Sequence, residues 1–345
     1  MNELTWSFSQ IWNKSLEENK DRPMRARSNM WASELGGSYI DRYLKMTGEE
    51  PTNPPNARSL RKFEAGNLME WVVGLVLKRA GILLDAQEWL SFQYNDPTLL
   101  EVTGKLDYLA GGRPDWEKGK NEIKELGLPD FFDRTINALI KHFESSAIFY
   151  PDGIKQIVLE IKSCSSFMFD YYERTRKPNS NHSLQTFHYL KAKNLDEGHI
   201  VYICKDDLRI IEFGVFLTDP SAEDAYRSDI AKMTDYFTKR ELPPKEDLIL
   251  FDKDTGRFTK NWKVEYSNYL EKLYGYKEPM NYSDEWQPRA AQWTRVLKRI
   301  VDEAKMTEAN LKIIEDMKLV FGNFDEIVSI AKTLKIDIPE GGEDE

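Results

Sequence analysis

The stretch QIVLEIKSC, from Gln156 to Cys164, places two charged side chains in an otherwise apolar run. A short run rich in isoleucine, valine and leucine predicts a buried β-strand. Successive side chains of a strand point to opposite faces, so Glu160 and Lys162 share one face, about 6.5 to 7 Å apart along the chain, while Leu159 and Ile161 share the other. For the charged pair, the alternatives are a strand face open to water and a functional site.

Two further carboxylates lie in apolar surroundings. Asp107 follows Gly104 in the strand-like run LEVTGKLDYLA (100–110), where an aspartate is disfavoured unless something binds it. Glu70 is the only ionisable residue of LMEWVVGLVL (68–77), a segment apolar enough to form a buried helix. The simpler explanations are a hydrogen-bonded aspartate at a strand end and a salt bridge from Glu70 to an arginine.

Together these carboxylates, one from a helix and two from strands, predict an oxygen-rich site. Carboxylate, carbonyl and water oxygens are the ligands that Mg²⁺ and Mn²⁺ prefer. We therefore expect Glu70, Asp107 and Glu160 to bind a divalent metal. Lys162 would lie beside the metal, where an amine can hold or deprotonate an attacking water and offset the charge that builds on a phosphoryl group.

A helix from about His182 to Asn194 carries a further candidate site. At about 100° per residue, its leucines and Phe187 fall on one side, while His182, Gln185 and Tyr189 gather on nearly the opposite side. We expect this second side to face away from the core, where an amide and a phenol can donate hydrogen bonds to a phosphate oxygen or a base edge. The alternative is an amphipathic helix with a solvated polar face.

The order of the predicted elements indicates an α/β (α+β) fold, in which a mixed central sheet is flanked by helices. A helix over 60–80 precedes three strands, and the helix just described precedes two more; these strands are predicted over 86–94, 100–110, 156–164, 199–205 and 208–216. Residues 1–60 are expected to form a helical and irregular segment that packs on this core. Residues 111–153 are expected to be an insertion with a helix around 131–143.

The last third of the chain is predicted to be helical. Helices are expected around 223–240, 262–274, 289–320 and 324–334. The final nine residues, DIPEGGEDE (337–345), hold five carboxylates and are expected to form a disordered acidic tail.

The net charge of −10 argues against a nucleic-acid partner when it is taken alone, because phosphate binding uses lysine and arginine. The distribution of charge is still compatible with DNA as a partner, since the tail accounts for five of the carboxylates and the segments 25–31 and 174–182 are locally basic. Arg174, Arg176 and Lys177 are therefore candidate DNA-binding residues. The alternative is that these segments are solvated surface loops.

Neither export nor membrane insertion is predicted. No run of about 18 apolar residues occurs, and the N-terminus lacks the charged-then-apolar order of a secretion signal. We therefore expect a cytoplasmic protein. Cys164 and Cys204, both in apolar strand-like runs, are expected to be reduced, buried thiols rather than a disulfide or part of a metal cluster.

In this order, the motifs resemble those of the PD-(D/E)XK nuclease superfamily, and within it the RecB-like exonuclease branch that includes CRISPR-associated and phage recombination exonucleases. The resemblance extends to the strand over 199–205. It rests on four motifs: Phe63-x-x-Gly66-x-x-x-Glu70, Gly104-x-x-Asp107, Glu160-x-Lys162 and Gln185-x-x-x-Tyr189.

This resemblance implies a restriction-endonuclease-like core over 61–285, interrupted by the insertion 111–153, and a C-terminal helical extension over 286–336. It implies a Mg²⁺- or Mn²⁺-dependent deoxyribonuclease, in the first instance an exonuclease that hydrolyses phosphodiester bonds in recombination, repair or phage DNA processing, within a bacterial or phage-infected cell. A recombinase or helicase is then a candidate partner. The implied roles are metal binding by Glu70, Asp107, Glu160 and the Ile161 carbonyl, catalysis by Lys162, and positioning of DNA by Gln185 and Tyr189.

The chain departs from the family pattern at two places. Many relatives have histidine where Glu70 stands. The cluster-bearing relatives carry four cysteines in stretches that correspond to 34–48 and 261–275, where this chain has none, so no iron–sulfur cluster is expected. Two rival functions stay open: an endonuclease that cuts at internal or branched sites, and a non-cleaving DNA-binding or assembly protein on the same fold.

Overall fold

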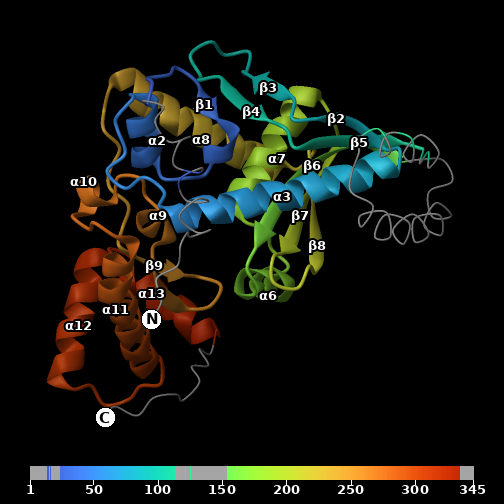
Figure 1. The fold of residues 1–345 in the computed structure, drawn as a ribbon. Coiled ribbons are helices and arrows are strands. Elements are labelled where there is room, and N and C mark those ends of the chain that lie inside the picture. The colour runs from blue at the N-terminus through green and yellow to red at the C-terminus, as the bar shows by residue number, and fades with distance from the viewer. Residues whose placement is uncertain are drawn as a thin grey trace, which may run out of the picture. The chain divides into compact units, whose positions relative to one another are not determined.

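A computed structural model describes residues 24–113 and 154–334, together with the single positions Lys14, Leu16, Asp115, Asn121 and Glu125. The chain divides into two compact units, one comprising Met1–Glu50 and Pro55–Pro243 and the other Pro51–Pro54 and Pro244–Glu345 (Figure 1). The predicted helix around 131–143 and the predicted tail 337–345 lie outside the described residues.

The first unit is a mixed α/β structure. In chain order its described elements are β1 (Met30–Trp31), the 3-10 helix η1 (Ala32–Glu34), α2 (Tyr39–Met46), α3 (Ala57–Arg79), β2 (Leu83–Ala86), β3 (Trp89–Phe92), β4 (Val102–Lys105), β5 (Tyr108–Gly112), β6 (Ile154–Cys164), α6 (Ser166–Thr175), α7 (Ser180–Lys193), β7 (Glu197–Cys204), β8 (Ile210–Phe216) and α8 (Pro220–Lys239). The predicted fold class, a mixed sheet flanked by helices, is confirmed. The helix α6 was not predicted.

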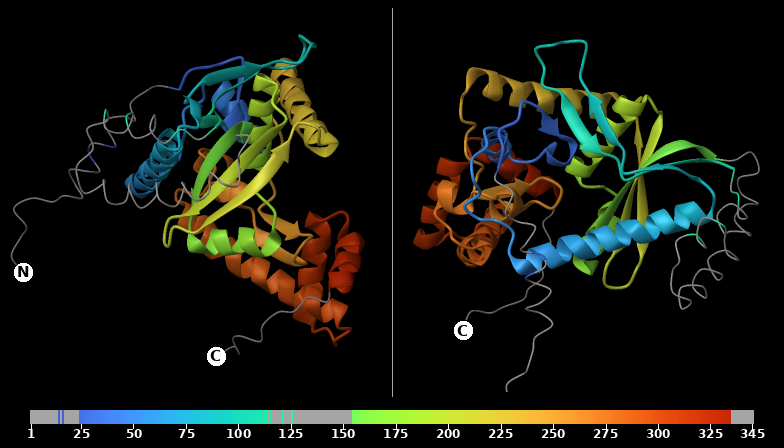
Figure 2. Two further views of the ribbon diagram at one scale, coloured as in Figure 1. Left: turned by 90° about the vertical axis from the view of Figure 1, so that its right-hand side faces the viewer. Right: turned by 45° about the horizontal axis from the view of Figure 1, so that its top comes forward.

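A five-stranded sheet in the order β2-β5-β6-β7-β8 forms the centre of this unit. Only β6 and β7 are parallel, and the other neighbouring strands are antiparallel. The helix α3 covers one face of this sheet and α7 covers the other (Figures 1 and 2). Both faces of the central strands are therefore buried, which explains their nearly continuous apolar sequences.

The alternation predicted for β6 is confirmed. Val158 joins the hydrophobic cluster on the α7 side, whereas Leu159 and Ile161 join the cluster on the α3 side. Cys164 and Cys204 are register partners at the ends of β6 and β7, and both are free thiols. Cys204 is buried as expected, but Cys164 is only partly buried.

The helix α3 begins at Asn56, whose side chain accepts the backbone N–H of Ser59 as an N-cap. It packs on the sheet through glycine: a Cβ added at Gly74 would meet the Tyr108 ring and hydroxyl, whereas one at Gly66 would meet only Ser163 Oγ, at 3.2 Å. The close approach at Gly74 sets the distance between α3 and the strand that follows Asp107.

Gly74→Ala is therefore expected to destabilise the protein by about 1–3 kcal/mol, because overpacking against a rigid ring outweighs the gain in helix propensity. Urea unfolding measures this change in the free energy of unfolding. Gly66→Ala is the matched control and should be neutral or slightly stabilising, since the hydroxyl of Ser163 can move aside. Equal effects at both positions would contradict the packing argument.

The prediction of one strand over 100–110 is wrong. This run forms two strands in different sheets: β4 belongs to a three-stranded sheet in the order β1-β4-β3, and β5 to the five-stranded sheet. The ladder is interrupted at Leu106 and Asp107, whose backbone groups bond to the segment before β3: Leu106 N donates to Glu88 O at 2.9 Å, and Gln87 N donates to Asp107 O at 3.1 Å. Asp107 therefore lies at the junction of the two sheets.

The second unit is mainly helical. Its elements are β9 (Ile249–Asp252), β10 (Arg257–Lys260), α9 (Trp262–Glu265), α10 (Leu270–Tyr274), α11 (Pro279–Val301), α12 (Glu308–Val320) and α13 (Phe324–Leu334). The β9–β10 hairpin was not predicted. The helix expected over 262–274 is interrupted because Ser267 Oγ accepts the backbone N–H of Tyr269 at 3.0 Å, a bond that competes with helix continuation. The long helix expected over 289–320 ends at Val301, two residues before Glu303, which has a φ of 54°.

No helix among residues 24–113 and 154–334 combines the length and the apolar character that crossing a lipid bilayer requires.

Candidate active site

The charged residues singled out in the sequence come together where α3, the β4–β5 junction and β6 meet. Tyr108, the first residue of β5, pairs with Leu159 in antiparallel register, so Asp107 lies beside Glu160 at the next position. The Oδ2 atom of Asp107 also accepts the backbone N–H of Ile161 at 2.8 Å. This bond fixes the aspartate against the central strand.

Glu160 is the most unusual residue of the site. Its side chain is 0% exposed and forms an ion pair with Lys162 through Oε1, whereas Oε2 has no hydrogen-bonding partner within residues 24–113 and 154–334. Burial raises the pKa of Glu160; the Lys162 ammonium opposes the shift and the Asp107 carboxylate adds to it. A buried carboxylate with an unfilled acceptor is costly, so the position calls for a further cation or a proton.

Lys162 shares its strand face with Glu160, as the alternation predicted. Its side chain is 26% exposed, in contrast to the fully buried Glu160. Burial lowers the pKa of Lys162, but the carboxylates of Glu160 and Asp107 outweigh that effect, so the pKa is raised. The lysine is therefore a protonated, positively charged group in this arrangement.

Glu70 completes the acidic group from α3. Burial raises its pKa, the Asp107 carboxylate raises it further, and the Lys162 and Lys105 ammonium groups lower it, which shows that these charges act on one another. The Tyr108 hydroxyl donates to the Glu70 backbone oxygen at 2.9 Å and holds this turn of α3 to the sheet. No salt bridge from Glu70 to an arginine is present among the described residues, and its side chain accepts from the Gln87 amide instead.

Two residues of the site were missed by sequence reasoning. Gln87 bonds to Glu70 through its side chain and to the Asp107 carbonyl through its backbone, and its φ of 59° is uncommon outside glycine. Nothing in the local sequence signals this role. Lys105 is exposed and lowers the pKa of both Glu70 and Asp107. Its position two residues before Asp107, in the same strand-like run, was a sequence signal that could have identified it.

The carboxylates are not arranged as a finished metal site. Within residues 24–113 and 154–334, no three acidic, histidine or cysteine side chains are grouped so that they could hold a metal ion. The chemistry of the donors nevertheless fits Mg²⁺ or Mn²⁺. The charges of three carboxylates influence one another, and a buried oxygen of Glu160 has no donor among the described residues. Because Lys162 neutralises Glu160 in this arrangement, a divalent ion at Glu160 would compete with the lysine.

The expectation that Gln185 and Tyr189 face away from the core is wrong. They are 6% and 1% exposed, respectively, and every residue from Leu184 to Leu190 is buried. Gln185 Nε2 donates to the Tyr189 hydroxyl at 3.1 Å, and this hydroxyl donates to the Lys105 backbone oxygen at 2.8 Å. The polar side is covered because β3, β4 and η1 pack over it. A ring edge of Tyr189 also fills the space that a Cβ at Gly104 would need.

Among the other predicted DNA-binding residues, His182 lies near the site. Its Nδ1 bonds to the Tyr202 hydroxyl at 2.8 Å, and Tyr202 is the register partner of Lys162. Burial, with a further contribution from Lys162, lowers the pKa of His182 to about 3, so the ring is neutral. Arg174, Arg176 and Lys177 are exposed at the end of α6 and in the loop that leads to α7. Their role in DNA binding stays a prediction.

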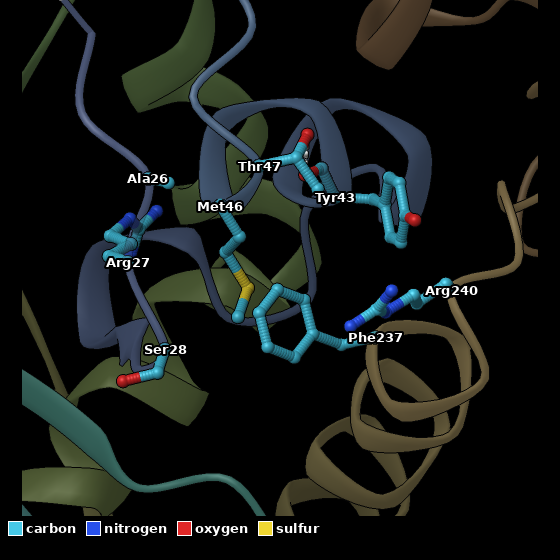
Figure 3. Close-up of a pocket in the computed structure, with 8 residues that line it drawn as sticks. All are labelled: Ala26, Arg27, Ser28, Tyr43, Met46, Thr47, Phe237 and Arg240. Carbon is cyan, nitrogen blue, oxygen red and sulfur yellow. Dashed lines mark hydrogen bonds between the residues drawn. The ribbon is translucent and has the colours of Figure 1, made fainter.

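A pocket of about 650 Å³ lies elsewhere in the first unit and contains none of the acidic site residues (Figure 3). It is bounded by α2, the end of α8 and the segment before β1, with Met46 and Phe237 as apolar walls and Arg27 and Arg240 on opposite sides. Arg27 is already paired with Glu34. The pocket therefore has no place in the chemistry of the acidic site.

No protein-family model matches the chain, and no curated protein matches it. Among solved structures, a protein called SSO0001 has a TM-score of 0.40 at 14% identity, with 77% of this chain and 95% of that chain covered. An alkaline exonuclease from Laribacter hongkongensis (LHK-Exo) has a TM-score of 0.33, and its complex with dAMP 0.35; each is 11% identical and covers 67% of this chain and 97% of that chain.

Proposed function

We propose that this protein is a metal-dependent DNA nuclease that hydrolyses phosphodiester bonds, most simply as an exonuclease. The observation that carries the proposal is Glu160, a carboxylate that is fully buried, lacks a hydrogen-bond donor at Oε2 in the part of the chain that the structure describes, and lies beside Asp107 and Lys162. If Glu160 and Lys162 formed only a structural ion pair, there would be no physical reason to bury the second oxygen of Glu160 without a donor or to place further carboxylates beside it.

In this proposal, Glu70, Asp107 and Glu160 hold Mg²⁺ or Mn²⁺, with the Ile161 carbonyl as a further ligand. A bound divalent ion supplies a Lewis acid and a more acidic water molecule. The protein orients its own groups: the Ile161 N–H fixes Asp107, Gln87 fixes Glu70, and the protonated Lys162 offsets the negative charge that develops on the phosphoryl oxygens.

The test is an assay on end-labelled single- and double-stranded DNA with Mg²⁺ or Mn²⁺, with and without a chelator. We expect shortening of the labelled strands that the chelator abolishes. A closed circular DNA in a parallel reaction separates the exonuclease, which leaves it intact, from the rival endonuclease. Absence of cutting on all three substrates with both metals would contradict the nuclease assignment.

A non-cleaving DNA-binding or assembly protein is the second candidate, and one observation favours it. Lys162 already neutralises Glu160, and the described residues contain no ready-made group of three metal ligands. In this candidate the charges form a buried network that needs no metal. Calorimetric titration with Mn²⁺ separates the two candidates, since only the nuclease is expected to release or absorb heat at the acidic site.

A further inference from the structure

The small sheet beside the acidic site has one buried face and one exposed face. Met30, Val102 and Phe92 are register partners across β1, β4 and β3 and pack into the hydrophobic core. The alternate positions must therefore point outward. These outward residues, which we call the outer face, are Trp31, Ser91, Thr103, Trp89 and Lys105.

The composition of the outer face is unusual for a solvated surface. Trp89 is 69% exposed and Trp31 is 47% exposed, although tryptophan is normally well covered. Trp89 and Lys105 are antiparallel register partners, so an exposed ring and a cation lie side by side. Figures 1 and 2 show β3 and β4 as neighbouring strands of one hairpin.

The cations next to the two exposed tryptophans differ in whether they are already paired with a carboxylate. The guanidinium of Arg27 lies over the Trp31 ring, 4.3 Å from its centroid, and is itself paired with Glu34. The Trp31 ring is therefore held in place by Arg27, and the charge of Arg27 is already neutralised by Glu34. Lys105, in contrast, forms no hydrogen bond or ion pair through its ammonium group within residues 24–113 and 154–334. It is the cation of the outer face that is available to an incoming anion.

The outer face leads directly to the acidic site. Lys105 and Asp107 are two positions apart, and the ammonium of Lys105 lowers the pKa of both Asp107 and Glu70. Trp31 and Trp89 lie two strands apart across the small sheet and two residues apart along it, so their Cα atoms are separated by a distance on the order of 12 Å. A flexible strand held across the outer face with a phosphate on Lys105 would thus pass next to Asp107.

We infer that the outer face binds a single strand of DNA, with bases stacked on Trp89 and Trp31 and a phosphate on Lys105, and delivers that strand to the acidic site. Exposed aromatic rings next to cations are the usual means of binding single strands, because every base offers a ring face. Bases of a duplex are hidden in the stack, so the outer face favours an unpaired strand. This inference rests on the proposed function, since it names the strand that the nuclease site receives.

Binding is measured by fluorescence anisotropy on the full chain in EDTA, so that no cutting occurs. The probe is a labelled mixed-sequence single strand, compared with the same strand annealed to its complement. We expect Trp89→Ala to weaken single-strand binding by about 5- to 100-fold. Trp89→Tyr should retain most of the affinity and Trp89→Leu should not, because an aromatic ring is required rather than apolar surface.

Two further variants sharpen the test. Trp262→Ala, which removes a 44% exposed tryptophan from the second unit, is the matched control and should bind as the unmodified chain does. Lys105→Gln should reduce the slope of log affinity against log salt concentration by about 0.7, the value for one lost phosphate contact with a single strand. Thermal unfolding of each variant establishes that the fold is retained.

The outcomes separate this inference from the proposed function. Ring-dependent single-strand binding without any metal-dependent cutting would support the outer face and reject the nuclease. Cutting by a Trp89→Ala protein that also binds single strands normally would overturn the outer face and leave the nuclease. Equal affinity for the duplex and the single strand would overturn it as well. A Trp89→Ala protein that differs from the unmodified chain in self-association, measured by sedimentation, but not in DNA binding would also overturn the inference.

Discussion

Replacing Lys162 with methionine is expected to lower the rate of metal-dependent DNA hydrolysis by about 10²- to 10⁴-fold, the range for loss of a charge-stabilising or proton-transferring group. Methionine keeps most of the aliphatic volume of the lysine and removes only its charge. Single-turnover cutting of end-labelled DNA in Mn²⁺ measures the change. The matched control is Lys155→Met, which alters an exposed lysine of the same strand β6.

The same variant makes a second measurement informative. Since Lys162 forms an ion pair with Glu160, its removal frees a buried carboxylate for a cation. We therefore expect Mn²⁺ affinity, measured by calorimetry, to stay the same or to increase while cutting is lost. Loss of metal binding together with activity would mean that Lys162 only supports the fold. Cutting at the unmodified rate would reject the catalytic role.

Much of this site was accessible from sequence because its charged residues interrupt apolar runs. A carboxylate in a buried strand or helix is expensive, so Glu160, Asp107 and Glu70 stood out without any structural information. The period of two in β6 correctly placed Glu160 and Lys162 on one face. The fold class followed from the order of helical and strand-like segments, and α3, β6 and α7 were predicted within a few residues of their bounds.

The errors have a common physical cause, which is tertiary covering that local sequence does not encode. Gln185 and Tyr189 lie on the polar side of an amphipathic helix, but the small sheet packs over that side and turns it into an interior hydrogen-bond relay. The break at Asp107 arises from backbone bonds to Gln87 and Glu88, residues about 20 positions earlier in the chain. Gln87 itself became visible only through the contact it makes with Glu70.

Glu160→Gln is expected to abolish the stabilisation of the protein by divalent ions. If Mn²⁺ binds the folded chain at Glu160, an ion concentration of 100 times the dissociation constant adds about 2.7 kcal/mol to the free energy of unfolding. Glutamine keeps the shape of the side chain and removes the charge that a hard cation needs. Urea unfolding with Mn²⁺ and with EDTA should therefore show a large increment for the unmodified chain and almost none for the variant.

In EDTA the order of stabilities should differ. The unmodified chain carries the desolvation cost of a fully buried carboxylate, whose Oε2 finds no donor among the described residues, whereas the neutral amide carries much less. Lys162 loses its partner in Glu160→Gln, but the carboxylates of Asp107 and Glu70 still act on its ammonium group. The variant should thus be at least as stable as the unmodified chain without metal and less stable with it.

Glu173→Gln, at an exposed position of α6, is the control and should change neither value appreciably. The reversal of order between EDTA and Mn²⁺ is the diagnostic result, because a residue that merely supports the fold loses stability under both conditions. A Glu160→Gln protein that keeps the full Mn²⁺ increment would place the ion elsewhere. An unmodified chain with no increment would show that the buried charges are balanced by Lys162 alone, which is what the non-cleaving candidate requires.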